Sequence, residues 1–197
     1  MDFSLNSEQM DIQKAAQEFA KGEFDPDAAL QHDQDQEFPS ALHKKAAKLG
    51  FVGIHIPEEY GGQGLGLIEN ALVVEAFCRY DSGLGMALAL SDFGFEIILR
   101  QGNEDQKQRI LPGIAQAKGI PTVAWFEEGY PLYPLNTFAK KQDHEYALQG
   151  GKSFVPLARM ARYLIVICQT GADDPFAQSV LLLEDMEEGI QVTSMGG

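Results

Sequence analysis

The chain has 197 residues with a formal net charge of −14 at pH 7, and 45% of its residues are hydrophobic. This hydrophobic content suffices for a buried core and excludes a disordered chain. The acidic balance argues against binding to nucleic acid or to an anionic membrane surface, because both require cationic patches. No apolar run approaches the ~20 residues that span a bilayer, and no secretory signal is visible at the N-terminus. We therefore expect a cytoplasmic protein.

Nucleophilic and metal-ligating residues are scattered along the sequence. The two cysteines, Cys78 and Cys168, are far apart, which predicts reduced thiols in the core rather than a disulfide. The histidines and carboxylates lack the spacing of a metal site, so we expect none. No Ser/His/Asp or Cys/His arrangement can be argued, and no catalytic residue is assigned. The four histidines are His32, His43, His55 and His144.

Residues 1–118 carry the signals of an N-terminal helical domain. Either Asn6 or Ser7 can cap a first helix, and Gln9 stands three residues after Asn6, as in a capping box. A second helix is expected to begin at Pro39 and to end at Gly50. Between them, the acidic and polar segment from Asp25 to Glu37 is expected to be a linker.

The rest of this region combines a glycine-rich loop with apolar helices. The loop from Pro57 to Gly64 needs backbone angles that side chains disfavour, so we expect a shaped structural loop. Two stretches, Leu67 to Arg79 and Leu84 to Leu99, are apolar on nearly every side and predict buried helices. Asn103 caps a last helix that Pro112 should end or bend. We expect a compact bundle of about four to six helices.

Residues 119–197 are expected to form a middle β-domain. Short β-branched and apolar runs predict about five to seven strands in a small antiparallel barrel or sandwich. The turn Gln142-Asp143-His144 predicts a hairpin. The whole chain is therefore assigned to the α+β class. The expected strands are Pro121–Phe126, Thr137–Lys141, Glu145–Gln149, Tyr163–Thr170 and Ser179–Glu184, with Ile190–Thr193 as a further one.

Trp125-Phe126 is the pair of aromatic residues most suggestive of a binding site. It ends the first expected strand, just after the helical region. Aromatic side chains at such a junction can line a ligand cleft, or they can fill the core, and the sequence leaves both readings open. The adjacent Glu127 and Glu128 should diverge in an extended segment, so they are not an acid/base pair.

Short motifs occur in a fixed order along the chain from Phe3 to about Gly197, and as an ordered set they resemble the acyl-CoA dehydrogenase family. They include a helix bounded by Phe38-Pro39 and Leu49-Gly50-Phe51, the loop Pro57 to Gly64, Asp81-Ser82, Gly102 to Lys107, Leu111-Pro112 and Gly150-Gly151-Lys152.

The resemblance implies a flavoprotein oxidoreductase of fatty acid metabolism that uses FAD to oxidise the Cα–Cβ bond of an acyl-CoA thioester. It implies an acyl-CoA or related thioester as substrate, an electron-transfer flavoprotein as a candidate partner, and a homo-oligomer when full length. Family members run to about twice this length. They carry their catalytic carboxylate in a C-terminal helical domain, which we expect this chain to lack.

By position in the family's motifs, two segments are expected to contact the flavin. The family reads Thr-Glu-Pro where this chain has Phe126-Glu127-Glu128, and Trp-Ile-Thr where it has Phe154-Val155-Pro156. The Gly-Ser-Asp that follows in the family has no match within Gly129 to Pro134. The expected cofactor-binding residues are Trp125, Phe126, Glu127, Phe154, Val155 and Pro156.

Two of these positions lack the hydroxyl groups of the family pattern. Phe126 has a ring in place of a hydroxyl, and Pro156 has neither a hydroxyl nor a backbone N–H. We therefore expect the 197-residue chain to bind FAD weakly or not at all. Two alternatives stay open: a non-catalytic binding or assembly module with this scaffold, and a different flavin enzyme on the same fold, such as a monooxygenase or nitroalkane oxidase.

Overall fold

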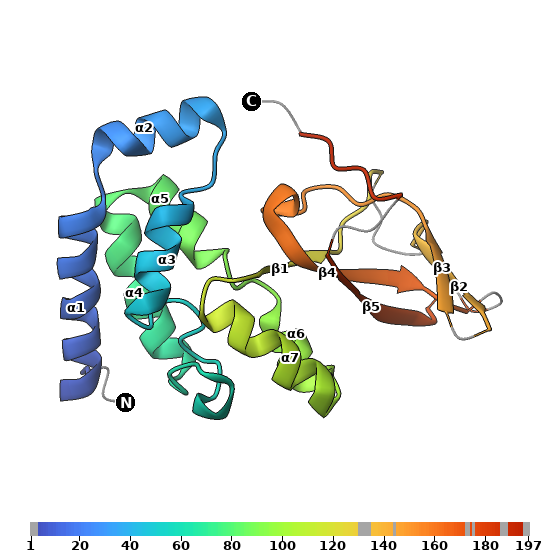
Figure 1. Cartoon of the computed structure of the whole chain (residues 1–197), viewed down its shortest axis with the longest axis horizontal. Coiled ribbons are helices and arrows are strands. Elements are labelled where there is room, and N and C mark those ends of the chain that lie inside the picture. Colours follow the sequence, from blue (N-terminus) through green and yellow to red (C-terminus); the bar gives the residue numbers. More distant parts are fainter. Residues whose placement is uncertain are drawn as a thin grey trace. The chain divides into compact units, whose positions relative to one another are not determined.

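The computed structural model describes residues 4–129, 135–143, 145–171, 174, 176–185 and 189–194 (Figure 1). The chain divides into two compact units, Met1–Gly119 and Ile120–Gly197, and each is described by itself. Within the described residues the first unit is helical and the second is built around a sheet. The helices are α1 (Ser7–Glu23), α2 (Pro26–Asp35), α3 (Ser40–Lys48), α4 (Leu67–Tyr80), α5 (Ser82–Ala89), α6 (Phe95–Gln101) and α7 (Glu104–Ala115).

Helix α1 begins as the sequence predicts. The Asn6 side chain accepts a hydrogen bond from the Gln9 backbone N–H at 2.8 Å, and the Gln9 side chain accepts one from the Asn6 N–H at 3.2 Å. This reciprocal capping satisfies two N–H groups that would otherwise lack helical partners. Helix α3 also agrees with the expected bounds, and Gly50 follows it with a φ of 81°.

The prediction of a linker between the first two helices is wrong, because most of it forms α2. Asp25 caps this helix by accepting from the Ala28 N–H at 2.8 Å, and Pro26 occupies its first turn. No residue of α2 is buried, so the helix has no apolar stripe for periodicity to detect. The cap and the proline were the available signals.

The single helix expected from Leu84 to Leu99 is also wrong, because it is interrupted between α5 and α6. Gly94 has a φ of 98°, which a helix interior does not permit. Asp92 lies between the two helices, and its carboxylate accepts a hydrogen bond from the Gly53 N–H at 2.9 Å. This tertiary contact explains the break, and with α2 it raises the described helices to seven, above the expected range.

Helix α7 carries the expected capping box at Asn103 and Gln106. Pro112 does not end the helix, which continues to Ala115. A proline in a last turn removes one backbone hydrogen bond only, so the remaining turn persists.

The glycine-rich loop is shaped by close packing. It contains a short 3-10 turn, η1 (Glu58–Tyr60), followed by Gly61 with a φ of 82°. A Cβ added to Gly62 would lie 2.0 Å from the Ile56 carbonyl oxygen, so only glycine fits there. The Tyr60 hydroxyl binds Glu104 at 3.0 Å and joins this loop to α7.

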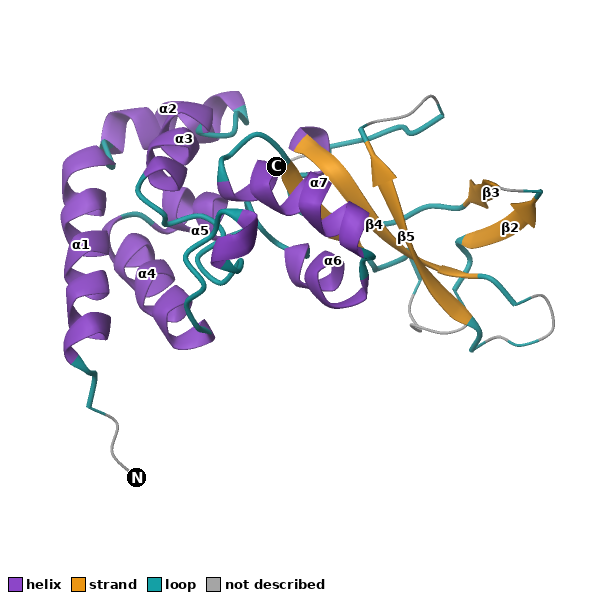
Figure 2. Ribbon diagram, turned by 60° about the horizontal axis from the view of Figure 1, so that its bottom comes forward, coloured by secondary structure: helices purple, strands orange, loops and turns teal. Residues whose placement is uncertain are grey.

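The core of the helical unit lies where α1, α3, α4 and α5 meet, and α1 runs beside α4 in both views (Figures 1 and 2). Four phenylalanine rings lie with centroids 5.4–6.2 Å apart and supply much of its apolar surface. They are Phe19, Phe24, Phe51 and Phe77.

The second unit has five strands within the described residues, and they form one mixed sheet (Figure 2). Strand β4 is central: β1 pairs with it in parallel along one side, and β5 pairs with it antiparallel. Strands β2 and β3 form an antiparallel hairpin that meets β4 through Phe138 and Gln169. The strands are β1 (Ile120–Ala124), β2 (Phe138–Gln142), β3 (Glu145–Gln149), β4 (Ala161–Gln169) and β5 (Gln178–Glu184).

The expectation of an antiparallel sheet is therefore wrong in part. The chain crosses between β1 and β4 through a long connection that contains the β2–β3 hairpin, and β1 and β4 pair in parallel. Pro121 lies beside a register shift in β1, as expected of a strand residue without an N–H. Residues 190–193 form no strand, and His144 of the predicted turn lies outside the described residues.

Candidate functional site

The structure brings the two predicted segments side by side. The Ser153 N–H donates to the Phe126 carbonyl at 2.8 Å. The Thr122 hydroxyl of β1 donates to the Pro156 carbonyl at 2.6 Å. Residues 153–156 thus run alongside residues 122–126 in the opposite direction, with Ser153 bonded to Phe126 and Pro156 to Thr122.

The rings of Trp125 and Phe126 are exposed, not packed in the core. Strand β1 ends at Ala124, so both residues follow it instead of closing it as expected. Their ring centroids are 6.0 Å apart with planes 19° from parallel. Trp125 is 43% exposed, Phe126 46% and Phe154 66%. Within the described part of the chain, the core-packing reading of this pair is wrong, and a solvent-facing apolar surface remains.

Glu127 lies behind this surface in an enclosed ion pair. Its carboxylate is 2.8 Å from the Lys152 ammonium, and the two side chains are 11% and 7% exposed. The carboxylate also accepts from the backbone N–H groups of Asn136 and Thr137. Burial alone would raise the pKa of Glu127, but hydrogen bonds from Lys152 and from residues 136 and 137 lower it to about 2. The Glu127 carboxylate is therefore ionised at neutral pH, and Glu128 is exposed and separate.

A tight glycine turn supports this ion pair. Gly150 has a φ of 147°, and a Cβ there would lie 2.5 Å from the Thr137 Cα. The Thr137 hydroxyl lies 3.3 Å from the Gly151 carbonyl and donates to it. Lys152 follows directly, so the turn delivers its side chain toward Glu127. Sequence reasoning used Gly150-Gly151-Lys152 as a fold marker and missed Lys152 and Thr122 as parts of the site.

The segment that contains Phe154 is held in an unusual conformation. Phe154 has a φ of 55° and Leu157 a φ of 51°, both in the left-handed region that bulky side chains rarely adopt. Such residues persist only where surrounding contacts fix them, and they concentrate at functional sites. Val155 packs against the sheet core, which leaves the Phe154 ring outside.

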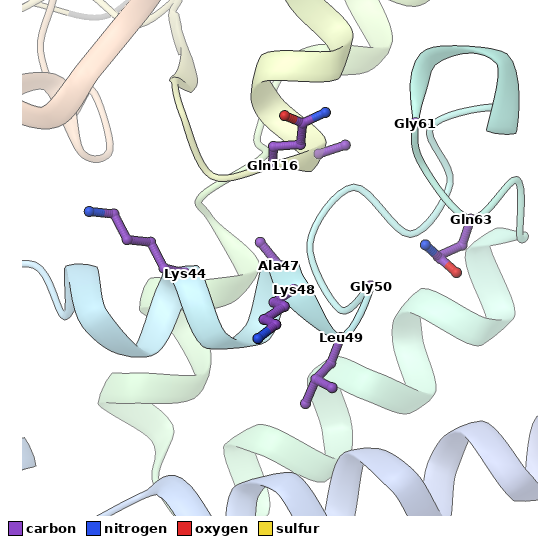
Figure 3. A pocket seen from close by; sticks show the side chains of 9 residues that line it. Lys44, Ala47, Lys48, Leu49, Gly50, Gly61, Gln63 and Gln116 are labelled. Carbon is purple, nitrogen blue, oxygen red and sulfur yellow. The ribbon is translucent and has the colours of Figure 1, made fainter.

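The helical unit has a separate depression that contains none of the six predicted site residues (Figure 3). It encloses about 450 Å³ between the last turns of α3 and α7 and the glycine-rich loop. Lys44 and Lys48 stand on α3, with Gln63 on the loop and Gln116 at the end of α7. Lysines beside helix C-termini are favoured by the exposed carbonyls, so their placement has a structural explanation.

Metal and membrane features complete the description. Among the described residues, no cluster of three or more His, Cys, Asp or Glu side chains could hold a metal ion. Within that same part of the chain, no helix is both long enough and apolar enough to cross a bilayer. Cys78 and Cys168 are both free; Cys168 is buried, as expected, whereas Cys78 is only half-buried.

Comparison with known proteins identifies the family. The profile described as "Acyl-CoA dehydrogenase, N-terminal domain" matches residues 6–118. The mitochondrial isobutyryl-CoA dehydrogenase of Bos taurus is 30% identical, over 94% of this chain and 45% of that protein. The probable acyl-CoA dehydrogenase YngJ of Bacillus subtilis (strain 168) is 34% identical, over 98% of this chain and 52% of its own length.

The structural comparison agrees. The crystal structure of an acyl-CoA dehydrogenase complexed with FAD from Bacillus anthracis superposes with a TM-score of 0.85 at 28% identity, covering 98% of this chain and 34% of that one. The chain belongs to the acyl-CoA dehydrogenase family, and the predicted α+β fold of that family is confirmed. The chain spans about half the length of the curated relatives it matches.

Proposed function

We propose that the chain forms the flavin-contacting part of a FAD-dependent acyl-CoA dehydrogenase-type oxidoreductase. The observation that carries the proposal is the exposed, stacked rings of Trp125 and Phe126, whose segment is bonded to the one that carries the exposed Phe154 and the enclosed ion-pair partner Lys152. Exposed rings of this kind normally serve a partner or ligand, because burying them is favourable. FAD, when bound, would accept the hydride removed from the acyl-CoA thioester.

The residues present fit one part of a flavin and not another. A flat ring system can stack on Trp125 or Phe126, whose own planes are close to parallel. For the polar edge of the flavin, these residues supply fewer hydrogen-bond donors than the family pattern does. Pro156 offers no donor, and the nearby Thr122 hydroxyl already donates to the Pro156 carbonyl. Glu127, engaged by Lys152 and by two backbone N–H groups, would support the backbone instead of contacting the cofactor.

This missing donor favours a second candidate, a non-catalytic module that keeps the scaffold and its aromatic surface. The two candidates predict different responses to restored hydroxyl groups. If the surface binds flavin, Pro156→Thr, which leaves the stacking rings in place, should tighten FAD binding by about 2- to 10-fold, since a hydrogen bond contributes about 0.5–1.5 kcal/mol. A non-flavin module should not respond.

The test is a titration of the 197-residue chain with FAD, read by flavin absorbance and by fluorescence of its single tryptophan, Trp125. Tyr146→Ala, which alters an exposed aromatic residue of β3, is the matched control. We expect weak or undetectable binding by the natural sequence and tighter binding by Pro156→Thr. A nanomolar dissociation constant for the natural chain would contradict the expected weakness. A complete lack of uptake by all variants would favour the non-catalytic module.

Catalytic turnover, partners and location are proposals of the same kind. Bleaching of bound flavin by an acyl-CoA without oxygen would single out dehydrogenation. Transfer of electrons to an electron-transfer flavoprotein would identify the acceptor. Homo-oligomerisation and a cytoplasmic location are likewise proposed, and size-exclusion chromatography with fractionation of the source cells would test them.

A further inference from the structure

Lys152 contacts the two residues on either side of Phe126. Its ammonium binds the Glu127 carboxylate at 2.8 Å and the Trp125 carbonyl at 3.1 Å. The next residue, Ser153, donates its N–H to the Phe126 carbonyl at 2.8 Å. Residues 152 and 153 therefore form hydrogen bonds to three consecutive residues, 125 to 127. The Lys152 side chain supplies two of these three contacts.

We propose that Lys152 is a positioning residue that fixes the backbone of residues 125–127 so that the Trp125 and Phe126 rings face outward. Its role toward a flavin rests on the proposed function above, but its role toward the rings does not. Exposed rings lose free energy by folding onto any apolar surface within reach, so a segment that keeps them exposed needs a restraint. The Lys152 ammonium is that restraint.

Both partners of the ion pair, Glu127 and Lys152, lie in segments that are themselves held by hydrogen bonds. Glu127 is fixed by the backbone N–H groups of Asn136 and Thr137, and Thr137 in turn binds the Gly151 carbonyl. The Lys152 side chain is only 7% exposed, so water competes weakly for its contacts. A lysine that merely neutralised a buried carboxylate would not need the Trp125 carbonyl, and that contact distinguishes the two roles.

The decisive comparison is between Lys152→Met and the double variant Lys152→Met with Glu127→Gln. The single variant loses the carbonyl contact and leaves a buried charge, whereas the double variant loses the contact without the charge. Nitrogen-15 relaxation of the Trp125 and Phe126 amides is the readout, because it reports local order in the folded protein. Lys152→Arg should restore both contacts, and Lys141→Met, which alters an exposed lysine of β2, is the control.

We expect order parameters near 0.85 at residues 125 and 126 in the natural protein, and values below about 0.6 in both methionine variants. Lys152→Arg and Lys141→Met should keep the natural values. A double variant as rigid as the natural protein would overturn the proposal, because charge neutralisation would then explain Lys152. Order parameters below about 0.6 in the natural protein would overturn it without any variant, even if the methionine variants fail to fold.

A FAD titration separates this proposal from the proposed function. If the natural chain takes up FAD, the double variant should bind it about tenfold more weakly, because the stacking surface is no longer preorganised. If the double variant binds FAD as tightly as the natural chain while its Trp125 and Phe126 amides are mobile, Lys152 has no role in flavin binding. Its role in positioning the rings would then still stand. If no form binds FAD, the flavin function fails, while the order parameters still decide whether Lys152 positions the rings.

Discussion

Acidification from pH 7.5 to pH 5 should act on two groups of the helical unit with opposite signs. His43 of α3 is 3% exposed, its Nε2 atom has no hydrogen-bond partner, and its ring packs edge-on to Phe38. Burial, and then the nearby Lys44 charge, lower the pKa of His43 from 6.5 to about 4. The folded protein therefore prefers neutral His43, and the stability contributed above pH 6.5 is lost as the pH falls toward 4.

Asp92 behaves in the opposite way. Burial raises the pKa of its carboxyl group from 3.8 to about 6, although the Gly53 hydrogen bond and His55 oppose the shift; Glu96 adds to it. A carboxylate with a raised folded pKa destabilises the folded state at neutral pH, and protonation removes that penalty as the pH falls through 6. Acidification should therefore raise the free energy of unfolding through Asp92 and lower it through His43.

The magnitudes follow from about 1.4 kcal/mol per pKa unit. Between pH 7.5 and pH 5, His43 should remove about 2 kcal/mol of unfolding free energy, and Asp92 should return about 1.5 kcal/mol. The natural protein should thus lose only about 0.5 kcal/mol through this pair. His43→Leu should gain about 1.5 kcal/mol on acidification, whereas Asp92→Asn should lose about 2 kcal/mol.

Urea unfolding at the two pH values, followed by circular dichroism at 222 nm, measures these changes. The described α-helices belong to the first unit, while the single tryptophan, Trp125, belongs to the second and reports that unit separately. His32→Gln, in the exposed helix α2, is the control for removal of a histidine. The reasoning is refuted if His43→Leu and the natural protein show the same pH dependence, or if both single variants shift in the same direction.

Two further expectations concern the helical unit and use the same unfolding assay. Gly62→Ala should destabilise the protein by about 1–3 kcal/mol, because its Cβ would lie 2.0 Å from the Ile56 carbonyl oxygen. Gly22→Ala, in α1 with nothing within 4 Å, should instead stabilise it by about 0.5–1 kcal/mol, and equal effects would contradict the packing argument. Asn103→Ala should cost about 1 kcal/mol by removing the cap of α7; an unchanged urea midpoint would show that the cap contributes nothing.

The sequence predicted most reliably the features that depend on neighbouring residues. The capping boxes at Asn6 and Asn103, the helix end at Gly50 and the shaped loop ending at Gly64 all appear in the structure. Each is a backbone requirement met within a few residues, so the signal and its cause lie together in the chain. The ordered motifs indicated the family for the same reason.

Features that depend on distant partners were mispredicted or missed. The break before α6 requires Gly53 to meet Asp92, thirty-nine positions along the chain. The parallel pairing of β1 and β4 depends on where the chain returns after the hairpin, which local patterns do not encode. Helix α2 was not predicted for a different reason: it buries no side chain and so shows no apolar periodicity.

At the candidate site, the sequence by itself determined which side chains are present and which donors are missing. Proline at position 156 has no N–H in any fold, and the aromatic rings at 125, 126 and 154 are fixed by the sequence. Only the tertiary structure decided that those rings face outward and that Lys152 and Glu127 form an enclosed pair behind them. Burial and ion pairing depend on which distant segments pack together, so they exist only after the strands have assembled.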